Sequence, residues 1–180
     1  MDSKNLIGVV LCGGESSRFG SDKALAIWRD KALVDHAIET LRPLCGSIVL
    51  LAGRSPHRFW GRLGDGVEVS SDPGKGPAEA LRFQLVEKPK PSLVIAVDMP
   101  FLDSDDLRAF LDAAAGGCAV LGDAKATLPC LLNRDFLSSD QPSMKASLKQ
   151  IKAQRISAES LGLSDQALGN INRAEELPTR

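Results

Sequence analysis

Hydrophobic residues gather in short, unbroken runs along the chain rather than in strict alternation with polar ones. Four of these runs predict β-strands, over residues 6–11, 48–52, 93–97 and 118–121. An unbroken apolar run of this length is typical of a strand that is buried on both faces of a parallel sheet. The sequence therefore predicts a mainly parallel sheet that is covered on both faces.

A second pattern, with an apolar residue at every third or fourth position, lies between these runs. It predicts a helix over residues 33–41. A second helix is predicted after Asp103 and through Leu111, with Asp106 as a weak capping box. A third is predicted from an apolar stripe of Met144, Leu148 and Ile151, with Ser143 as its cap. Because strands and helices alternate, we expect an α/β fold, a Rossmann-like three-layer α/β/α sandwich around the central sheet.

The composition limits the class of protein further. Of the 180 residues, 43% are hydrophobic and 25% are charged, which suits one ordinary globular domain over residues 1–180. The 22 basic and 23 acidic residues nearly cancel, and no stretch is apolar over the length of a membrane span. We therefore expect neither a nucleic-acid partner nor a membrane partner.

The cysteines indicate a reducing compartment. Cys12, Cys45, Cys118 and Cys130 include no C-x-x-C pair and no zinc-site spacing, so they predict reduced thiols. The first apolar run is too short for a signal peptide, and glycines follow it. A cytoplasmic protein is the expectation from both observations.

The segment after the first predicted strand carries the most specific motif. Residues 11–23 read Leu-Cys-Gly-Gly-Glu-Ser-Ser-Arg-Phe-Gly-Ser-Asp-Lys. Its glycines allow a tight turn and a close approach of the backbone to phosphate, and Arg18 and Lys23 add two cations. It is not a Walker A loop, because the Gly-Lys-Ser/Thr ending is absent, and it is not a dinucleotide fingerprint, because the spacing of the glycines differs. A flexible surface loop is the alternative, but the full spacing favours a triphosphate-binding loop.

Asp98-Met99-Pro100 follows the run over residues 93–97 directly. A carboxylate at the carboxyl end of a buried strand can hold Mg²⁺, which takes one or two carboxylates together with phosphate oxygens and water. An ordinary turn aspartate before a proline is the competing interpretation.

Two further segments are candidates for ligand contacts. Residues 72–77 read Asp-Pro-Gly-Lys-Gly-Pro ahead of a predicted helix, which suits a nucleotide or phosphate contact, although an ordinary turn before a helix competes with it. Near the C-terminus stand Asn170 and Asn172. The alternative there is that Asn172 caps a helix, with Glu175 completing a capping box.

Taken in order, these segments resemble the markers of the molybdenum cofactor guanylyltransferases. The loop is similar to that family's signature, and Gly13-Gly14 with Asp22-Lys23 favours the guanylyl branch over the cytidylyl relatives. Asp-Met-Pro resembles the family's metal-binding segment, and Asn-x-Asn resembles its segment that faces the active site. The chain departs from the family pattern at Cys12, Phe19, Gly53 and Glu79.

The resemblance implies a nucleotide-diphospho-sugar transferase-like fold and an activity. GMP would pass from GTP to the phosphate of molybdopterin that carries molybdenum, pyrophosphate would leave, and Mg²⁺ would be the cofactor. Catalytic roles fall to Arg18, Lys23 and Asp98, with Asp98 as the metal ligand. The implied nucleotide-binding residues are Leu11, Cys12, Gly13, Gly14, Lys23, Gly53, Asp72, Gly76, Pro77 and Asp98, and the acceptor-binding residues are Asn170 and Asn172. Other cofactor-biosynthesis proteins or recipient molybdoenzymes are expected as transient partners.

An acceptor phosphate is already ionised near neutral pH, so this reaction requires no strong general base. His36, which lies off the apolar face of its helix, and His57, between arginines in a loop, are accordingly expected to be solvated and not catalytic. Two other functions stay open. One is a relative that uses CTP or another nucleotide with a pterin or a sugar phosphate. The other is a non-catalytic nucleotide- or pterin-binding protein, against which Arg18, Lys23 and Asp98 together argue.

Overall fold

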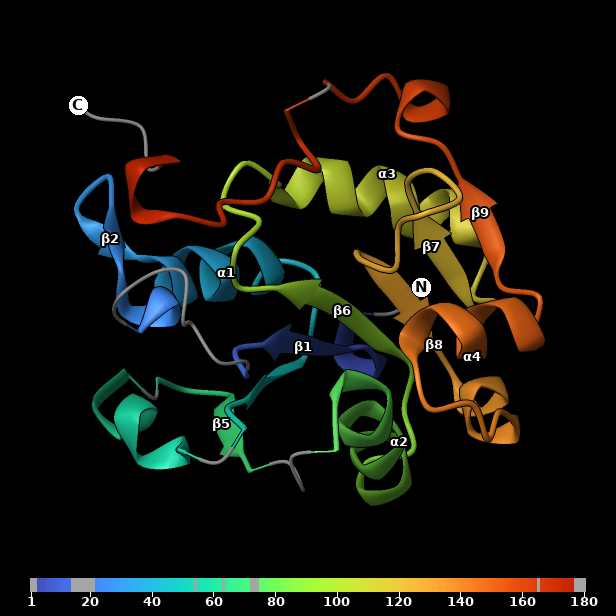
Figure 1. The fold of residues 1–180 in the computed structure, drawn as a ribbon, viewed down its shortest axis with the longest axis horizontal. Helices are drawn as coiled ribbons and strands as arrows, with labels where there is room; N and C mark the ends of the chain where they lie inside the picture. Colours follow the sequence, from blue (N-terminus) through green and yellow to red (C-terminus); the bar gives the residue numbers. More distant parts are fainter. Residues whose placement is uncertain are drawn as a thin grey trace.

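The computed structural model describes residues 3–13, 22–53, 55–62, 64–71, 75–164 and 166–176. A seven-stranded sheet with the order β5-β4-β1-β6-β8-β7-β9 forms the centre of the molecule (Figure 1). Its strands are β1 (Ile7–Leu11), β4 (Ser47–Leu51), β5 (Val67–Ser70), β6 (Ser92–Ala96), β7 (Ala119–Leu121), β8 (Cys130–Leu132) and β9 (Gln154–Ile156). A separate ribbon pairs β2 (Ile27–Trp28) antiparallel with β3 (Lys31–Ala32).

The pairing of the strands confirms a mainly parallel sheet. β1 pairs in parallel with β4 and β6, β4 with β5, and β7 with β9, whereas β8 runs antiparallel to β6 and β7. Each of the four predicted runs coincides with a strand to within one residue at either end, namely β1, β4, β6 and β7.

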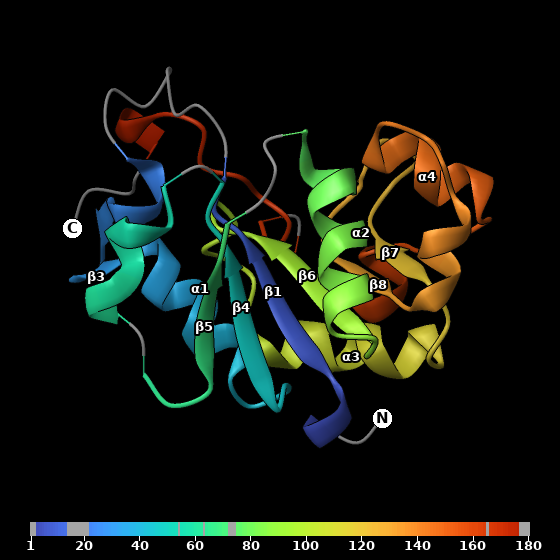
Figure 2. The same ribbon diagram turned by 90° about the horizontal axis from the view of Figure 1, so that it is seen from below.

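The three layers are also confirmed. The helices are α1 (Leu33–Leu41), α2 (Pro77–Glu87), α3 (Ser104–Ala114) and α4 (Met144–Gln150). Buried residues of α1 and α3 share one core with Val10 of β1, and those of α2 and α4 share the other with Val9. Neighbouring residues of one strand thus face opposite cores, as the alternation of a strand requires. Figure 2 shows the strands seen from below with helices around them.

Local capping fixes where the helices begin. The Asp103 side chain accepts hydrogen bonds from the backbone N–H groups of Asp105 and Asp106 at 2.9 Å each. The Asp106 side chain accepts one from the Asp103 backbone N–H, so the capping box is complete. Ser143 caps α4 through the backbone N–H of Ala146. Both predicted caps are confirmed, and each cap of this kind contributes about 1 kcal/mol to stability.

The carboxyl ends of the central strands lie level with one another. Leu11 at the end of β1 is paired with Leu51 of β4 and with Ala96 of β6. The residues that follow, Gly13 and Asp98 among them, therefore emerge at the same edge of the sheet, as the sequence predicts. Gly14 lies outside the described residues. None of the described helices combines the length and the apolar character that crossing a membrane requires.

Candidate functional site

An ion pair joins the two loops at this edge. The Lys23 Nζ donates to Asp98 Oδ2 at 2.7 Å, across 75 residues of sequence. The two side chains are only 16% and 18% exposed, so their attraction is screened less than that of a surface pair. The structure thus places two of the three predicted catalytic residues in direct contact. The third, Arg18, lies outside the described residues.

Short-range contacts hold Lys23 in place. It begins the 3₁₀ turn Lys23–Leu25, which Asp22 caps by accepting from the Ala24 backbone N–H at 3.1 Å. Ala24 is buried, and the ribbon that follows brings Trp28 against Phe101 edge to face, with ring centroids 5.4 Å apart. Because Phe101 stands three residues after Asp98, this aromatic pair ties the segment of the lysine to that of the aspartate.

Asp98 has one carboxylate oxygen still available. Oδ2 accepts from Lys23, whereas Oδ1 is buried and has no hydrogen-bond partner among the residues that the structure describes. A buried oxygen without a partner is costly, and a divalent cation is a chemically suitable partner for it. No cluster of three or more His, Cys, Asp or Glu within the described ranges is arranged to hold a metal. The fit is therefore to a metal that takes most of its other ligands from phosphate and water, as Mg²⁺ does.

Cys12 lies at the start of the predicted phosphate-binding loop, directly after β1. Its backbone N–H donates to Leu51 O at 2.9 Å, and its side chain is 6% exposed. Burial raises the pKa of the Cys12 thiol well above its ordinary value, and nearby Arg58 lowers it only in part. The structure therefore supports a small buried side chain directly after β1 rather than a reactive thiolate.

Two glycines of the predicted nucleotide site have left-handed backbone. Gly53, after β4, has φ of 63°, a conformation that glycine and asparagine adopt most readily. Gly76, with φ of 93°, immediately precedes Pro77, the first residue of α2. The helix N-terminus is thus present as predicted. Asp72 lies outside the described residues.

The C-terminal segment reaches the same edge. The Ile171 backbone N–H donates to Asp98 O at 2.9 Å, so the Asn-x-Asn segment runs beside the aspartate. The backbone N–H of Asn172 donates to the carboxylate of Glu176 at 2.6 Å. The alternative interpretation, a helix capped by Asn172 with Glu175 completing a capping box, is therefore wrong: Glu176 accepts instead of Glu175, and the element that follows is a short 3₁₀ turn, Ala174–Glu176.

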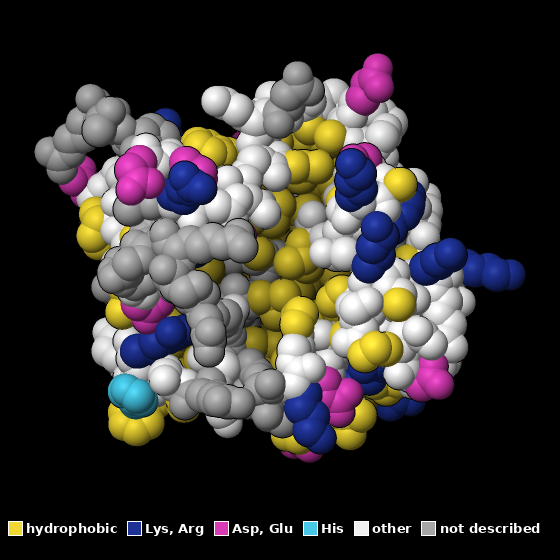
Figure 3. Space-filling model, viewed as in Figure 1, with side chains coloured by type: hydrophobic (Ala, Val, Ile, Leu, Met, Phe, Trp, Pro, Cys, Tyr) yellow, Lys and Arg dark blue, Asp and Glu magenta, His cyan; other side chains and the backbone are white. Residues whose placement is uncertain are grey.

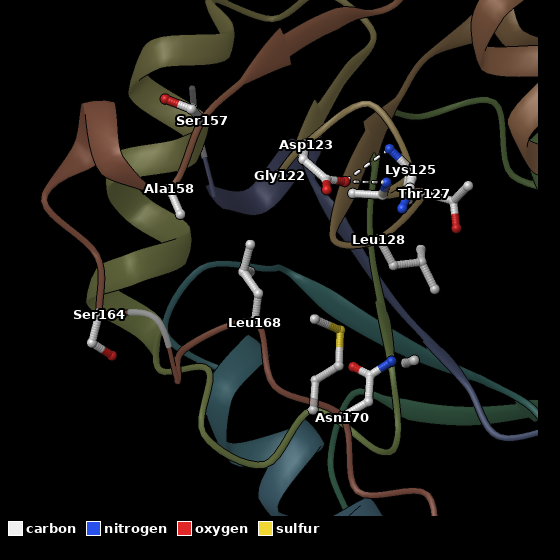
Figure 4. Close-up of a pocket in the computed structure, with 13 residues that line it drawn as sticks. Gly122, Asp123, Lys125, Thr127, Leu128, Ser157, Ala158, Ser164, Leu168 and Asn170 are labelled. Atoms are coloured by element: carbon white, nitrogen blue, oxygen red, sulfur yellow. Dashed lines mark hydrogen bonds between the residues drawn. The ribbon is translucent and has the colours of Figure 1, made fainter.

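A cavity of about 560 Å³ opens next to Asp98. Figure 3 shows this face of the molecule hollowed, with hydrophobic side chains in the hollow. Figure 4 shows polar side chains around the cavity and Leu128 and Leu168 among them. Its lining consists of Ala96, Met99, Gly122, Asp123, Lys125, Ala126, Thr127, Leu128, Ser157, Ala158, Ser164, Leu168 and Asn170. Asn170 belongs to this lining, whereas Asn172 does not.

The segment that follows β7 forms one wall of the cavity, and hydrogen bonds within the protein hold this wall in place. Asp123 Oδ1 accepts from the backbone N–H groups of Lys125 and Ala126 at 2.8 and 3.0 Å. Arg155 Nη1 donates to Asp123 O and Ala126 O at 2.7 and 3.1 Å. A wall held in this way loses little conformational entropy when a ligand binds.

Glu79, one of the departures from the family pattern, pairs with Arg82, whose Nη1 lies 3.3 Å from its carboxylate. One histidine differs from the sequence-based expectation. His36 is half-buried rather than solvated: its Nε2 lies 2.7 Å from Trp28 O and its ring centroid 4.9 Å from that of Trp28. His57 is exposed, as expected.

The sequence reasoning missed the cavity wall and Arg58. Gly122 and Asp123 come directly after the strand predicted over residues 118–121, so the rule that ligands bind beyond carboxyl ends would have found them. Arg58 carried no such signal, because its partners include two backbone carbonyls, those of Cys12 and Ala52.

The comparisons with known proteins agree with this geometry. The sequence profile described as "MobA-like NTP transferase domain" matches residues 8–163. A molybdenum cofactor guanylyltransferase from Acidiphilium cryptum is 35% identical over 66% of this chain and 62% of its own length. Another, from Ectopseudomonas mendocina, is 30% identical over 79% of this chain and 69% of its own.

The fold is shared as well. The crystal structure of molybdopterin-guanine dinucleotide biosynthesis protein A from Archaeoglobus fulgidus superposes with a TM-score of 0.77, at 20% identity, over 95% of this chain and 94% of that one. With the profile matching most of the sequence, the conclusion is plain: the chain belongs to the family of MobA-like NTP transferase domains.

Proposed function

We propose that this chain transfers GMP from GTP to the phosphate of molybdopterin that carries molybdenum, and releases pyrophosphate. The observation that carries the proposal is the Lys23–Asp98 pair with the buried Asp98 Oδ1, at the edge of the sheet where the next residue, Met99, lines the cavity. Two relatives that bear this activity in their names are aligned with the chain over 62% and 69% of their own length. Their names support the proposal.

GTP would bind along the carboxyl edge of β1, β4 and β6. The backbone of Leu11, Cys12, Gly13 and Gly14 would hold phosphates, with Arg18 and Lys23 supplying positive charge. Gly53, Asp72, Gly76 and Pro77 would contact the nucleoside or the phosphates. Support comes from the level ends of β1 and β4, after which Cys12, Gly13 and Gly53 emerge at one edge of the sheet.

Mg²⁺ would be held by Asp98, whose buried Oδ1 is available for it. When bound, the metal would neutralise negative charge on the phosphates. Lys23 would then exchange part of its contact with Asp98 for a phosphate oxygen. The long lysine side chain can make this exchange because its ammonium group donates three hydrogen bonds.

The chemical step is an in-line displacement. An oxygen of the acceptor phosphate forms a bond to the α-phosphorus of GTP, the bond from that phosphorus to the bridging oxygen of the β-phosphate breaks, and the electron pair leaves with pyrophosphate. The second pKa of a phosphate monoester is about 6, so the acceptor is ionised at neutral pH and gives up no proton. The protein's part is positioning and charge neutralisation.

The acceptor would occupy the cavity. Its apolar members Met99, Leu128 and Leu168 suit a flat ring system, and Asn170 adds an amide to the lining. A cytoplasmic location is proposed with this activity, because all four cysteines carry free thiols. Contacts with recipient molybdoenzymes or other cofactor-biosynthesis proteins are part of the same proposal.

The choice of nucleotide is directly measurable. Isothermal titration in the presence of Mg²⁺ is expected to give a dissociation constant for GTP about tenfold or more below that for CTP, a difference of about 1.4 kcal/mol. ATP and UTP serve as controls for binding through the triphosphate alone. Tighter binding of CTP would contradict the guanylyl assignment and favour a cytidylyl relative.

Gly122 tests whether the acceptor binds in the cavity. Its φ is 121°, and a Cβ there would lie 2.7 Å from Ala126 Cβ and 3.4 Å from Leu168 Cδ1. Gly122→Ala is therefore expected to distort the wall and raise KM for the acceptor by about tenfold, with the dissociation constant for GTP changed less than about twofold. Steady-state kinetics with varied acceptor measures the first, and titration the second.

Gly162→Ala is the matched control, since Gly162 also has a positive φ, 69°, but a Cβ there meets nothing within 4 Å. An unchanged acceptor KM in Gly122→Ala, or an equal rise in both variants, would contradict the placement of the acceptor.

A further inference from the structure

One guanidinium group connects three segments at the edge of the sheet. Arg58 Nη2 donates to Cys12 O at 2.6 Å and to Ala52 O at 3.4 Å, and Nη1 lies 3.1 Å from Asp22 Oδ2. Cys12 directly follows β1, and Ala52 directly follows β4. Asp22 directly precedes Lys23 and caps its turn. The side chain of Arg58 is 21% exposed, so these contacts are largely shielded from water.

The element that carries Arg58 is held firmly in the core. Arg58 belongs to the 3₁₀ helix Pro56–Arg62, and the residue after it in the same helix, Phe59, is fully buried. The guanidinium lies over the Phe59 ring, with Cζ 4.6 Å from the ring centroid. A planar group with five donors in fixed directions can hold a carboxylate and carbonyl oxygens together, which a lysine ammonium cannot do in the same geometry.

The two ends of the signature loop therefore meet at one side chain. Cys12 stands at the start of the loop and Asp22 at its end, and Arg58 holds the carbonyl of one and the carboxylate of the other. Since closing a chain segment costs conformational entropy, a clamp that closes it in the free protein spares the ligand that cost.

We propose that Arg58 is a positioning residue, which fixes Cys12 and Asp22 relative to each other and thereby sets Lys23 opposite Asp98 before GTP binds. The proposal rests on the proposed function, since GTP is the ligand used to detect it. Arg58 acts through Asp22 and the backbone of Cys12. It leaves the reacting atoms to Lys23 and Asp98, and its loss therefore weakens nucleotide binding more than turnover.

Arg58→Met keeps the length of the side chain and its contact with Phe59 but removes the clamp. We expect the dissociation constant for Mg²⁺-GTP and the KM for GTP to rise about tenfold or more, while kcat at saturating GTP falls less than about threefold. Arg58→Lys does not restore binding to the level of the unaltered protein, because one ammonium cannot replace the fork. Measurements are made below the melting temperature of every variant.

Arg82→Met is the matched control. Arg82 is similarly buried, with 15% of its side chain exposed, and it donates to Ser139 O and Ser147 Oγ at 2.9 and 2.8 Å, between α2 and α4. Arg82→Met thus loses a comparable set of hydrogen bonds away from the signature loop. We expect this variant to bind GTP with a dissociation constant within about twofold of that of the unaltered protein.

Asp22→Asn supplies the second variant. The amide keeps an oxygen for the Ala24 cap but loses the charge that faces Arg58. If the clamp acts through Asp22, then Asp22→Asn weakens GTP binding on its own and adds little when combined with Arg58→Met.

Three results would overturn the inference: additive losses in the double variant, a fall in kcat with unchanged KM, or equal losses in Arg82→Met and Arg58→Met. A protein that binds no GTP even when unaltered would instead contradict the proposed function, so the two failures are distinguishable.

Discussion

Asp98→Asn is expected to lower turnover by about a hundredfold or more at submillimolar Mg²⁺, and the defect is expected to ease as Mg²⁺ is raised. The substitution keeps the shape of the side chain but removes the negative charge that a divalent cation requires. It also withdraws the charge that holds Lys23 at 2.7 Å. A loss of this size is typical when one group that stabilises the transition state is removed. Pyrophosphate release, measured with the acceptor present over a range of Mg²⁺ concentrations, tests this expectation.

Asp103→Asn is the control for that variant. Asp103 lies five residues after Asp98 and allows the same change from aspartate to asparagine, but its role is to cap α3. Asparagine caps helices as well as aspartate does, so turnover is expected to be unchanged. A defect in Asp98→Asn that does not depend on Mg²⁺, or one shared by Asp103→Asn, would argue against a metal at Asp98.

Lys23→Ala is expected to lower turnover by a similar factor, about a hundredfold or more, at every Mg²⁺ concentration. The lysine would donate to phosphate oxygens whose charge grows in the transition state, and no cation replaces it in the variant. The free energy of unfolding is expected to fall by about 1 to 2 kcal/mol, because the half-buried Asp98 loses its partner. Turnover and thermal melting are measured on the same preparation.

Lys31→Ala is the matched control, because Lys31 pairs with Glu39 at 2.6 Å in a position where both side chains are at least half exposed. Such a pair contributes less than about 1 kcal/mol, and it lies outside the proposed site. Near-normal turnover in Lys23→Ala would show that the loop is structural, and a non-catalytic nucleotide-binding protein would become the better account.

The central strands could be predicted because both of their faces are buried. β1, β4 and β6 are apolar at nearly every position, which leaves no other interpretation at that length. β5 went unpredicted, since only Val67 of its four residues is buried. β8 was missed because its three apolar residues directly follow Pro129, and β9 because two of its three residues are polar and exposed.

The site was predictable only as far as the strands order it. The rule of carboxyl ends brings Gly13 and Asp98 together, but no sequence pattern reports a contact such as that between Lys23 and Asp98, 75 residues apart. Arg58 illustrates the same limit. Its position beside His57 suggested a solvated surface loop, whereas its guanidinium in the structure donates to the Cys12 carbonyl. One domain over residues 1–180, and the catalytic, metal-binding, nucleotide-binding and acceptor-binding roles of all the site residues, stay predictions.

Transfer of the nucleotide from GTP to the acceptor can be followed directly. The protein is incubated with Mg²⁺, molybdopterin carrying molybdenum, and GTP labelled at the α-phosphorus, and the products are separated. Label is expected to move to the acceptor, with one pyrophosphate released for each label transferred, and Lys23→Ala and Asp98→Asn are expected to abolish most of both. Label that stays in GTP although GTP binds, or transfer that proceeds better from labelled CTP, would contradict transfer of GMP by this chain.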